Sequence, residues 1–530
     1  MKTYDAVIIG AGHNGLVCAF YLAKAGLRVR VVERRGVVGG AAVTESFAPG
    51  FRNSTASYTV SLLNPKIIAD MRLAAHGLRV VNRPIANFLP LDERRFLKVG
   101  GGLARTQAEV AKYSARDAER LPAYYTMLEA VADLLRAIAV KTPPGLRGEA
   151  FDLLRMIDQG AAAAKLSPAQ RRDALALFTR SASEILDHWF ESDPIKAAFG
   201  FDAVVGNFTS PDAPGSAYVL LHHVFGEANG EKGAWGHAIG GMGAITQAMA
   251  MACAERGVEI VTDSPVARVH VSDGMAVGVR LEDGKDVYAR AVICNATPQH
   301  LFGALIDPAA LTAETRERMG TYKSGSATLR MNVALDRLPR FSCLPEPGEH
   351  LQSGIIIAPS LAYMDRAFSE AKSTGWSRAP IVEMLIPSTI DETLAPEGKH
   401  VASLFCQHFA PRLPERSWDD AREEAADLVI DTVDALAPGF KASVIARSAL
   451  SPLDLERTFG LTNGDIMHGR MSLDQLWAAR PMLGHGDYRM PIKRLYLCGA
   501  GAHPGGGVSG LPGMNAAREV ARDLRFRFGA

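Results

Sequence analysis

The run from Tyr4 to Glu33 constrains the fold of this 530-residue chain more than any other segment. The β-branched stretch "DAVIIG" predicts a buried parallel strand, and it leads into the motif Gly10-x-Gly12-x-x-Gly15. The segment "LVCAFYLAKAG" follows with helical spacing, and "RVRVVE" predicts a second strand that ends at Glu33. A strand, a glycine turn, a helix and a second strand, with an acid about twenty residues after the turn, indicate a dinucleotide-binding βαβ unit.

Each residue of this turn has a physical role in such a unit. Gly10 permits the tight turn, Gly12 lets a pyrophosphate approach the backbone, and Gly15 lets the helix lie close to the strand. The amino terminus of the helix faces the phosphates. His13 and Asn14 stand at that terminus, so we predict that they also contact the cofactor.

The residues at the end of the second strand indicate which dinucleotide binds. Glu33 can accept hydrogen bonds from the adenosine ribose, and its charge disfavours a 2′-phosphate. Arg34 either contacts the pyrophosphate or is solvated. Gly39, Gly40 and Ala41 resemble the extended fingerprint of flavoproteins with two dinucleotide-binding domains, although a simple loop turn is the alternative. We therefore predict FAD as the cofactor.

Residues 240–298 predict the second half of the same domain. A helix expected from Ala244 to Arg256 leads into the strand "VEIVT", a small meander with "DG" turns, and a buried strand that ends in "NATP". In an FAD-binding domain of this pattern, we expect the backbone near Val266 to hold the adenine.

The carboxyl-terminal segment predicts a third strand, loop and helix. "RLYLCGAG" has the pattern of a short buried strand, and the helix "MNAAREVARDLRFRF" follows the glycine loop "HPGGGVSG". The start of that helix can face the isoalloxazine ring, where negative charge accumulates on reduction. The cofactor contacts predicted here are Gly499, Ala500, Gly507, Met514 and Asn515.

The rest of the chain predicts a second domain inserted into the first. Residues 102–196 are rich in helix formers at helical spacing, whereas residues 322–450 mix strand-like runs with a helix expected from Trp418 to Leu436. The predicted fold class is α/β: a discontinuous FAD-binding Rossmann-type domain with an inserted α+β substrate domain that carries an antiparallel sheet and a helical subdomain. The expected boundaries are 1–85, 236–320 and 485–530 for the FAD-binding domain, and 86–235 and 321–484 for the substrate-binding domain, with the helical insertion at about 102–200.

Across almost its whole length the chain resembles the phytoene-desaturase-like FAD oxidoreductases. The motifs that carry the resemblance are "VIIGAGHNGLV", which many flavoproteins share, and the more specific "GAWGHAIGGMGAI", "SPLDLERTFGLTNGDIMHGRMSLDQL" and "LYLCGAGAHPGGGVSG". The resemblance implies non-covalent FAD, a substrate cavity above the flavin, and dehydrogenation, desaturation or isomerisation of an apolar small molecule. Many related flavoproteins have Gly-Asp at the end of the last strand, where this chain has Gly499-Ala500, so that carboxylate contact is absent or is supplied by backbone.

No acid–base constellation is placed by spacing, so the catalytic assignments rest on position alone. His503 lies in the predicted flavin loop and either meets the substrate or flavin or bonds a loop carbonyl. Trp235 and His237 either line the cavity or serve packing. Only one convincing dinucleotide fingerprint is present, so we expect oxygen or a quinone to accept the electrons. The alternatives are an amine-oxidase-like enzyme, which would show an aromatic cage, and an FAD-binding interaction protein without turnover.

Composition excludes several other classes. With 58 Lys and Arg against 57 Asp and Glu, the net charge of +1 leaves no basic footprint for a nucleic acid. The six cysteines form no CxxC or CxxxxC pair and no metal-ligand cluster is present, so we expect no metal and no thiol chemistry. No signal peptide precedes Tyr4, and the uncharged run from Ala6 to Ala23 is interpreted as a buried βα unit, which favours a cytoplasmic protein. Peripheral membrane contact and self-association stay open.

Overall fold

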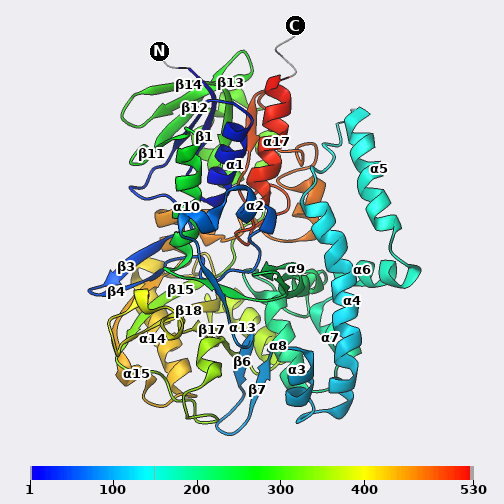
Figure 1. The fold of residues 1–530 in the computed structure, drawn as a ribbon, viewed down its shortest axis with the longest axis vertical. Helices are drawn as coiled ribbons and strands as arrows, with labels where there is room; N and C mark the ends of the chain where they lie inside the picture. The colour runs from blue at the N-terminus through cyan, green and yellow to red at the C-terminus, as the bar shows by residue number, and fades with distance from the viewer. Residues whose placement is uncertain (1–2, 148–149, 526–530) are drawn as a thin grey trace.

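The computed structural model describes residues 3–147 and 150–525 and arranges them around two seven-stranded β-sheets (Figure 1). The first sheet has the strand order β11-β2-β1-β14-β13-β12, with β20 paired to β14. Its strands are β1 (Tyr4–Ile9), β2 (Val29–Val32), β11 (Glu259–Val261), β12 (Val266–Ser272), β13 (Met275–Leu281), β14 (Asp286–Cys294) and β20 (Leu495–Leu497).

The parallel part of this sheet aligns the carboxyl ends of strands that are far apart in sequence. Strand β1 runs parallel to both β2 and β14, and its last residue, Ile9, pairs with Val32 on one side and Cys294 on the other. Strands β11 and β20 extend the parallel arrangement outward, while β12 and β13 form the antiparallel meander that the sequence predicts. Ligands bind at this kind of edge in open α/β sheets.

Three helices pack together beside the first sheet: α1 (His13–Lys24), α10 (Met242–Glu255) and α17 (Leu511–Arg525) (Figure 1). Helix α1 lies between the other two and buries Leu16 and Val17. A Cβ at Gly513 would lie only 2.1 Å from the carbonyl oxygen of Asn14, so this glycine permits α17 to approach α1 closely. Helix α10 begins two residues before the predicted Ala244, where the Ser54 hydroxyl accepts a hydrogen bond from the Met242 amide.

The second sheet has the order β19-β15-β18-β17-β16-β6-β7 and is antiparallel except between β6 and β16. Strand β15 is buried along its whole length and β18 from Val401 onward, and helix α14 (Trp418–Asp434) contributes Trp418, Val429 and Ile430 to the same core. This helix ends two residues before the predicted Leu436. The strands are β6 (Asn87–Pro90), β7 (Phe96–Val99), β15 (Leu329–Leu335), β16 (Gly354–Ile357), β17 (Trp376–Leu385), β18 (His400–Phe409) and β19 (Val444–Leu450).

A helical region lies on one flank of the molecule, at the right in Figure 1. Its core centres on Tyr124 of α4, whose ring centroid lies 4.9 Å from that of Phe190 and 5.0 Å from that of Phe199. The Ser114 hydroxyl caps α4 by accepting a hydrogen bond from the Asp117 amide. The helices are α3 (Leu103–Val110), α4 (Ala115–Ala139), α5 (Ala150–Ala164), α6 (Pro168–Thr179), α7 (Ala182–Trp189) and α8 (Asp193–Val204).

Shorter elements connect these parts. The two-stranded pairs are β3 (Thr44–Ala48) with β4 (Phe51–Ser54), β5 (Val80–Asn82) with β10 (Gly236–Ala238), and β8 (Glu227–Ala228) with β9 (Glu231–Lys232). The remaining α-helices are α2 (Pro65–Asp70), α9 (His222–Phe225), α11 (Pro298–His300), α12 (Ala313–Gly320), α13 (Leu361–Thr374), α15 (Phe440–Ser443) and α16 (Pro452–Phe459).

The two sheets divide along the chain in the way that the predicted segments do. Every strand of the first sheet lies within 1–85, 236–320 or 485–530, and every strand of the second lies within 86–235 or 321–484. The domain boundaries themselves stay a prediction. All six cysteines are unpaired, and all but Cys343 are buried. Within the described ranges, none of the helices combines the length and the apolar character that crossing a bilayer requires.

Candidate functional site

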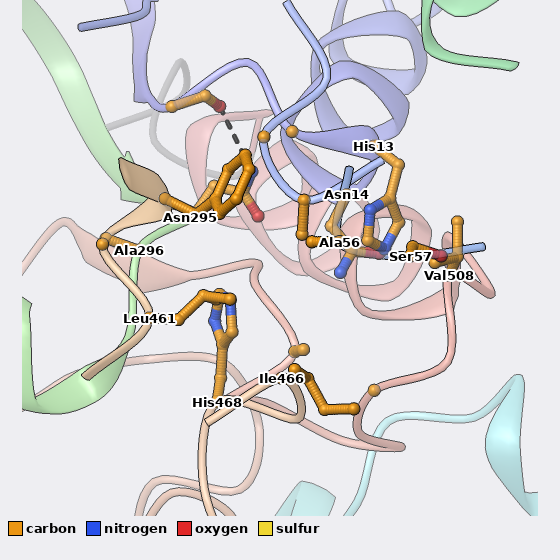
Figure 2. Close-up of a pocket in the computed structure, with 18 of the residues that line it drawn as sticks. His13, Asn14, Ala56, Ser57, Asn295, Ala296, Leu461, Ile466, His468 and Val508 are labelled. Carbon is orange, nitrogen blue, oxygen red and sulfur yellow. Dashed lines mark hydrogen bonds between the residues drawn. The ribbon is translucent and has the colours of Figure 1, made fainter. Parts of the chain in front are cut away.

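A cavity of about 330 Å³ lies along the carboxyl ends of the parallel strands of the first sheet. Ile9, Val32 and Asn295, at or just beyond the ends of β1, β2 and β14, line one side of it, and the cavity continues to Phe405 on β18 of the second sheet. Its volume is within the usual range for a site that encloses an organic ligand. Figure 2 shows part of its lining.

The glycine turn before α1 lies directly over Asn295, which follows β14. The Asn295 side-chain amide donates a hydrogen bond to the Gly10 carbonyl oxygen at 3.3 Å (Figure 2). A Cβ at Gly12 would lie 2.8 Å from that amide nitrogen, and one at Gly15 would lie 2.2 Å from the Gly10 carbonyl oxygen. Gly10 itself has φ +95°, which other residues rarely adopt. The turn therefore requires these glycines before any ligand is considered.

The Glu33 carboxylate lies at one end of the cavity and is almost completely buried. It accepts hydrogen bonds from the backbone amides of Ala11 (2.8 Å) and Arg35 (3.0 Å), which hold it beside the glycine turn. Ser264, Pro265 and Val266 line the same end. Glu33 and Val266 are therefore together where the sequence predicts an adenosine.

The start of α1 contributes His13 and Asn14 to the lining. The Asn14 side-chain oxygen is buried and has no hydrogen-bond partner within the described part of the chain. Burial lowers the pKa of His13 to about 4, so this side chain is neutral at neutral pH. His468, on a loop below them in Figure 2, also lines the cavity, and burial lowers its pKa to about 3.

Arg34 lines the cavity, but its guanidinium is directed to the end of helix α16. It donates hydrogen bonds to the carbonyl oxygens of Arg457 (3.1 Å) and Thr458 (2.6 Å). Arg34 is exposed, so these contacts are compatible with the solvated alternative, and a contact with the pyrophosphate stays a prediction. Arg34 also joins the FAD-binding segment to a segment that follows the second sheet.

The loop after β2 lies against the glycine turn, as the extended fingerprint predicts. Gly39 donates its amide to the Ala11 carbonyl oxygen at 2.9 Å, and a Cβ at Gly39 would lie 2.6 Å from the Ala42 carbonyl oxygen. Gly40 and Ala41 line the cavity, and Gly40 has φ +55°. This loop is therefore a second close-approach segment on the same ligand space.

The carboxyl-terminal glycine loop forms the opposite wall, but only part of its predicted set reaches the cavity. Ala500 and Gly507 line it, and Gly499 packs against the backbone of Asn295, where a Cβ would lie 2.7 Å from the carbonyl oxygen. Met514 and Asn515 lie outside the lining.

The Asn515 side chain has a structural contact within the described residues. Its amide donates to the carbonyl oxygen of Ala139 at 2.9 Å and to the hydroxyl of Tyr488 at 3.0 Å, and so ties α17 to the end of α4. The Asn515 side-chain oxygen is buried and has no hydrogen-bond partner within the described residues, so a cofactor contact of this residue stays a prediction.

Of the three side chains predicted to be catalytic, Trp235 lines the cavity and the two histidines lie outside the lining. His237 Nε2 lies 2.8 Å from the buried Asp391 carboxylate. His503 Nε2 lies 3.3 Å from the carbonyl oxygen of Ile138, and burial lowers the pKa of His503 to about 4. The His237 ring is engaged by Asp391 and the His503 ring by the Ile138 carbonyl oxygen, both outside the lining, and their catalytic roles stay a prediction. For His503, the contact is with a backbone carbonyl, as in the structural alternative, but that carbonyl belongs to helix α4 and not to a loop.

A polar cluster that sequence reasoning did not identify lies behind the cavity wall at Tyr58. The Tyr58 hydroxyl donates a hydrogen bond to the buried carboxylate of Glu383 on β17. The Tyr58 ring stacks on Phe405, with centroids 5.2 Å apart, and the buried guanidinium of Arg330 lies 4.8 Å from the Tyr58 centroid. Tyr58 and Phe405 both line the cavity, so the cluster holds one rigid phenol at its wall.

Arg83 adds a second guanidinium to this cluster. It donates a hydrogen bond to the Thr59 hydroxyl and lies 6.0 Å from the Trp235 ring centroid. Two guanidiniums therefore accompany one carboxylate. Burial, followed by the nearby Glu383 carboxyl, raises the pKa of Tyr58 well above its usual value. Burial also raises the pKa of Glu383, although the hydrogen bond from Tyr58 and both guanidiniums oppose that shift. The shared proton therefore rests on Tyr58.

The sequence contains a weak signal for this cluster. Glu383 interrupts the apolar run "IVEMLIP", and Arg330 is the one charge in the mostly apolar run "ATLRMNVAL"; buried charges are rare unless paired. Their partner Tyr58 is 325 residues away from Glu383, so no local spacing connects them.

The donor set fits FAD and offers nothing to a metal. Among the described residues, no group of three or more His, Cys, Asp and Glu side chains could hold a metal ion. Three features of the lining fit this cofactor. The buried side-chain oxygen of Asn14, which has no partner among the described residues, offers a polar group at the start of α1. The Glu33 carboxylate can accept hydrogen bonds from a ribose, and the glycines at positions 12 and 40 let the backbone approach a ligand closely. These are the contacts that a flavin adenine dinucleotide requires.

Comparison with known proteins agrees with this geometry. Residues 15–523 match a family model described as "Flavin containing amine oxidoreductase". The chain is 44% identical to pyridine nucleotide-disulfide oxidoreductase domain-containing protein 2 of Mus musculus, over 98% of this chain and 94% of that protein. The specific motifs of the sequence indicate this same branch of the phytoene-desaturase-like proteins, and the match confirms it.

More distant relatives cover the chain equally well. It is 25% identical to one of the polypeptides of limonene dehydrogenase from Castellaniella defragrans (99% of this chain, 95% of that protein) and 24% identical to prolycopene isomerase 2 of an Oncidium hybrid (99% and 85%). Among solved structures, putrescine oxidase bound to putrescine has a TM-score of 0.61 at 16% identity, covering 99% of this chain and 100% of that one. That last likeness shows a shared fold.

Proposed function

This chain belongs to the family of flavin-containing amine oxidoreductases and is an FAD-dependent oxidoreductase; within that class, we propose that it dehydrogenates or isomerises an apolar small molecule and passes the electrons to oxygen or a quinone. The observation that carries the proposal is the apolar lining of the cavity around Tyr58. The side chains that form this lining are Leu62, Val205, Phe405, Leu461, Ile466, Met467 and Val508.

The proposed reaction needs an acceptor for a hydride and an acceptor for a proton. When bound, FAD supplies the hydride acceptor. Removing a hydride from one carbon makes the C–H bond of the neighbouring carbon strongly acidic, so a weak base is sufficient to take the remaining proton and complete the double bond. The Tyr58 oxygen can receive that proton while its own proton moves to the carboxylate of Glu383. The Tyr58 ring stacks on Phe405 and lies against the Arg330 guanidinium, which fixes the position of that oxygen.

The proposed electron acceptors rest on the sequence. Residues 10–15 form the only convincing dinucleotide fingerprint, and a nicotinamide-using flavoprotein of the disulfide-reductase type would usually show a second one. A small oxidant that diffuses to the reduced flavin is therefore favoured over NAD(P).

An amine substrate is the alternative that the fold most directly raises, and the charges of the site oppose it. A protonated amine requires a carboxylate or an aromatic cage that faces it. Here Glu383 is already shared between Tyr58 and two guanidiniums, and the rings of Tyr58 and Phe405 stack on each other instead of facing across the cavity. A neutral ligand avoids repulsion by Arg83 and Arg330.

The proposal is tested by mixing the oxidised holoprotein anaerobically with a cyclic terpene hydrocarbon or with putrescine and following the flavin absorbance. We expect the terpene to bleach the flavin and putrescine to leave it unchanged, with recovery on addition of oxygen or a quinone. Bleaching by putrescine alone would assign the protein to the amine oxidases. A flavin that neither ligand reduces, but that photoreduction does reduce, would support an FAD-binding protein without turnover on either class.

The role of Tyr58 is tested with the substrate that reduces the flavin. Tyr58→Phe should lower the rate of reduction about 100-fold or more, and Glu383→Gln should flatten its pH dependence, because both remove the path for the proton. Tyr125→Phe, at a partly buried tyrosine outside the cavity lining, is the matched control and should leave the rate unchanged. Equal rates in Tyr58→Phe and wild type would remove Tyr58 from the mechanism.

A further inference from the structure

Helix α5 (Ala150–Ala164) has its polarity reversed relative to an ordinary surface helix. Asp152 and Gln159 are each only 5% exposed, whereas the large apolar side chains of the same helix point to solvent. These outward residues, which we call the outer face of α5, are Phe151 (61% exposed), Leu153 (61%), Leu154 (60%), Met156 (48%) and Ile157 (59%). A surface helix of a globular protein normally does the opposite.

Polar contacts to the rest of the molecule hold the inner face of α5 in place. The Asp152 carboxylate accepts hydrogen bonds from the backbone amides of Gly145 (2.6 Å) and Arg147 (2.9 Å). Arg155 donates to the buried carboxylate of Glu519 on α17 at 2.8 Å. These contacts fix which side of the helix is inward.

A second pair of contacts fixes the far half of the helix. The Gln159 amide donates to the carbonyl oxygen of Thr142 at 2.9 Å, and its side-chain oxygen accepts from the indole nitrogen of Trp477 at 2.6 Å. The helix cannot rotate to bury its apolar side without breaking these polar contacts. The exposure of the outer face is therefore a property of the fold.

Further apolar side chains are exposed before and after α5 in the chain, and basic residues follow the helix. Leu175 on α6 is 64% exposed and Leu146, just before the helix, is 43% exposed. Between residues 165 and 180 the chain has four basic residues and one acid, Asp173. The basic residues are Lys165, Arg171, Arg172 and Arg180, all exposed, which we call the basic rim. Arg171 donates to the carbonyl oxygen of Ala164, which places this residue of the rim at the end of α5.

From this arrangement we propose that the outer face of α5 docks onto the surface of a lipid bilayer that contains anionic lipids. A helix that lies in the plane of the interface buries its apolar face among the acyl chains and places basic residues at the headgroups. Figure 1 shows α5 at the edge of the molecule, where a flat surface can reach it.

Charge favours a bilayer over a second copy of the chain. A two-fold interface through α5 would place the same surface against itself and bring two basic rims together, whereas anionic headgroups complement the rim. Apolar patches of this kind on a protein surface mark sites of interaction. The proposal does not depend on the substrate class proposed above, although an apolar substrate would be concentrated in the same bilayer.

The test is flotation of the full-length holoprotein with vesicles of phosphatidylcholine mixed with phosphatidylglycerol, and with vesicles of phosphatidylcholine alone. We expect the wild type to float with the mixed vesicles and more weakly with the neutral ones, and salt to reduce the difference. The triple substitution Leu153→Gln, Leu154→Gln and Ile157→Gln should lower the apparent partition coefficient at least about tenfold.

The matched control removes three exposed apolar side chains elsewhere: Leu103→Gln, Met251→Gln and Ile445→Gln, at 43%, 49% and 50% exposure. It should float like the wild type, and all variants should retain the flavin absorbance of the folded protein. A wild type that stays unbound, or an equal loss in both triple variants, overturns the proposal. A third outcome would assign the outer face of α5 to a second copy of the chain instead. In that case the wild type would not bind vesicles, light scattering would show it as a dimer, and only the α5 variant would be a monomer.

Discussion

His408 has a buried imidazole for which the described residues provide no hydrogen-bond partner at either ring nitrogen. It lies among aromatic rings, with centroids 5.6 Å from Phe208 and 5.7 Å from Phe368. Burial lowers its pKa to about 3, so the folded protein holds it neutral where an unfolded chain would bind a proton. Stability is therefore unaffected above about pH 6.5 and is lost as the pH falls from there towards 3.

The substitution His408→Phe should remove this loss. At about pH 5 the buried neutral imidazole costs about 2 kcal/mol relative to an unperturbed one, and at about pH 8 it costs nothing. We compare the change in melting temperature that the substitution causes at each pH. The change should be more favourable at acidic pH than at alkaline pH, because any overpacking by the larger ring acts equally at both. Calorimetry at the two pH values measures the difference, with the exposed His188→Phe as control. An identical shift at both pH values would show that His408 does not titrate with unfolding.

Single residues also show where sequence reasoning succeeds. Gly10, Gly12, Gly15 and Glu33 were identified because their roles depend on neighbours within about thirty residues. Tyr58 was missed because its partner Glu383 is on a strand of the other sheet, and the pairing exists only once both sheets are assembled. His503 was placed near the flavin by its loop, but its ring orientation depends on the Ile138 carbonyl of a distant helix.

At the scale of elements, helices α1 and α5 each contain a glycine, and the two glycines differ in how closely other atoms approach them. A Cβ at Gly15 in α1 would lie 2.2 Å from the Gly10 carbonyl oxygen, whereas nothing lies within 4 Å of a Cβ at Gly160 in α5. Neither glycine has a left-handed backbone, so the same change to alanine separates close approach from helix propensity.

We expect Gly15→Ala and Gly160→Ala to have opposite effects. Gly160→Ala should stabilise the protein by up to about 1 kcal/mol, because alanine has the higher helix propensity. Gly15→Ala should destabilise it by about 1–3 kcal/mol and lower the FAD content, because the turn must shift. Denaturant unfolding and the ratio of flavin to protein absorbance measure both effects. Full FAD content in Gly15→Ala would contradict the close packing of α1 on the turn.

The orientation of α5 is an element-scale result that periodicity does not predict. The apolar spacing of residues 150–164 is that of an ordinary amphipathic helix, for which one expects the apolar side to face inward. The structure turns the other side inward because the buried Glu519 carboxylate and the Thr142 carbonyl, together with the indole of the partly exposed Trp477, offer polar partners to that side. A helix buries the face for which its surroundings provide partners, and those surroundings are set by remote segments.

At the scale of the whole molecule, the cavity joins segments from both sheets, so ligand binding should stabilise the entire fold. Glu33 and Gly12 line it from the first sheet and Phe405 lines it from the second. A ligand that binds only the folded state adds about 2.7 kcal/mol at a concentration about 100 times its dissociation constant.

Adding FAD to FAD-depleted protein should therefore raise the thermal midpoint in a single transition, and NADP⁺ should not. The Glu33 carboxylate, held by two backbone amides, would repel the 2′-phosphate of NADP⁺. Differential scanning fluorimetry with each ligand measures the shifts, with AMP as a control for the adenosine end alone. Equal shifts from FAD and NADP⁺ would argue against the assigned role of Glu33.

The sequence by itself determined the cofactor class, the segments that form the first sheet and the glycine loop before the first helix, because those features depend on short-range patterns of glycine, β-branched and acidic residues. Only the tertiary structure decided that Tyr58, Glu383, Arg83 and Arg330 form one cluster at the cavity wall, and that α5 presents its apolar side to solvent. Both depend on contacts between segments that are distant in the chain. The free energy of burying a charge or a polar face is settled by the partners that the completed fold brings to it.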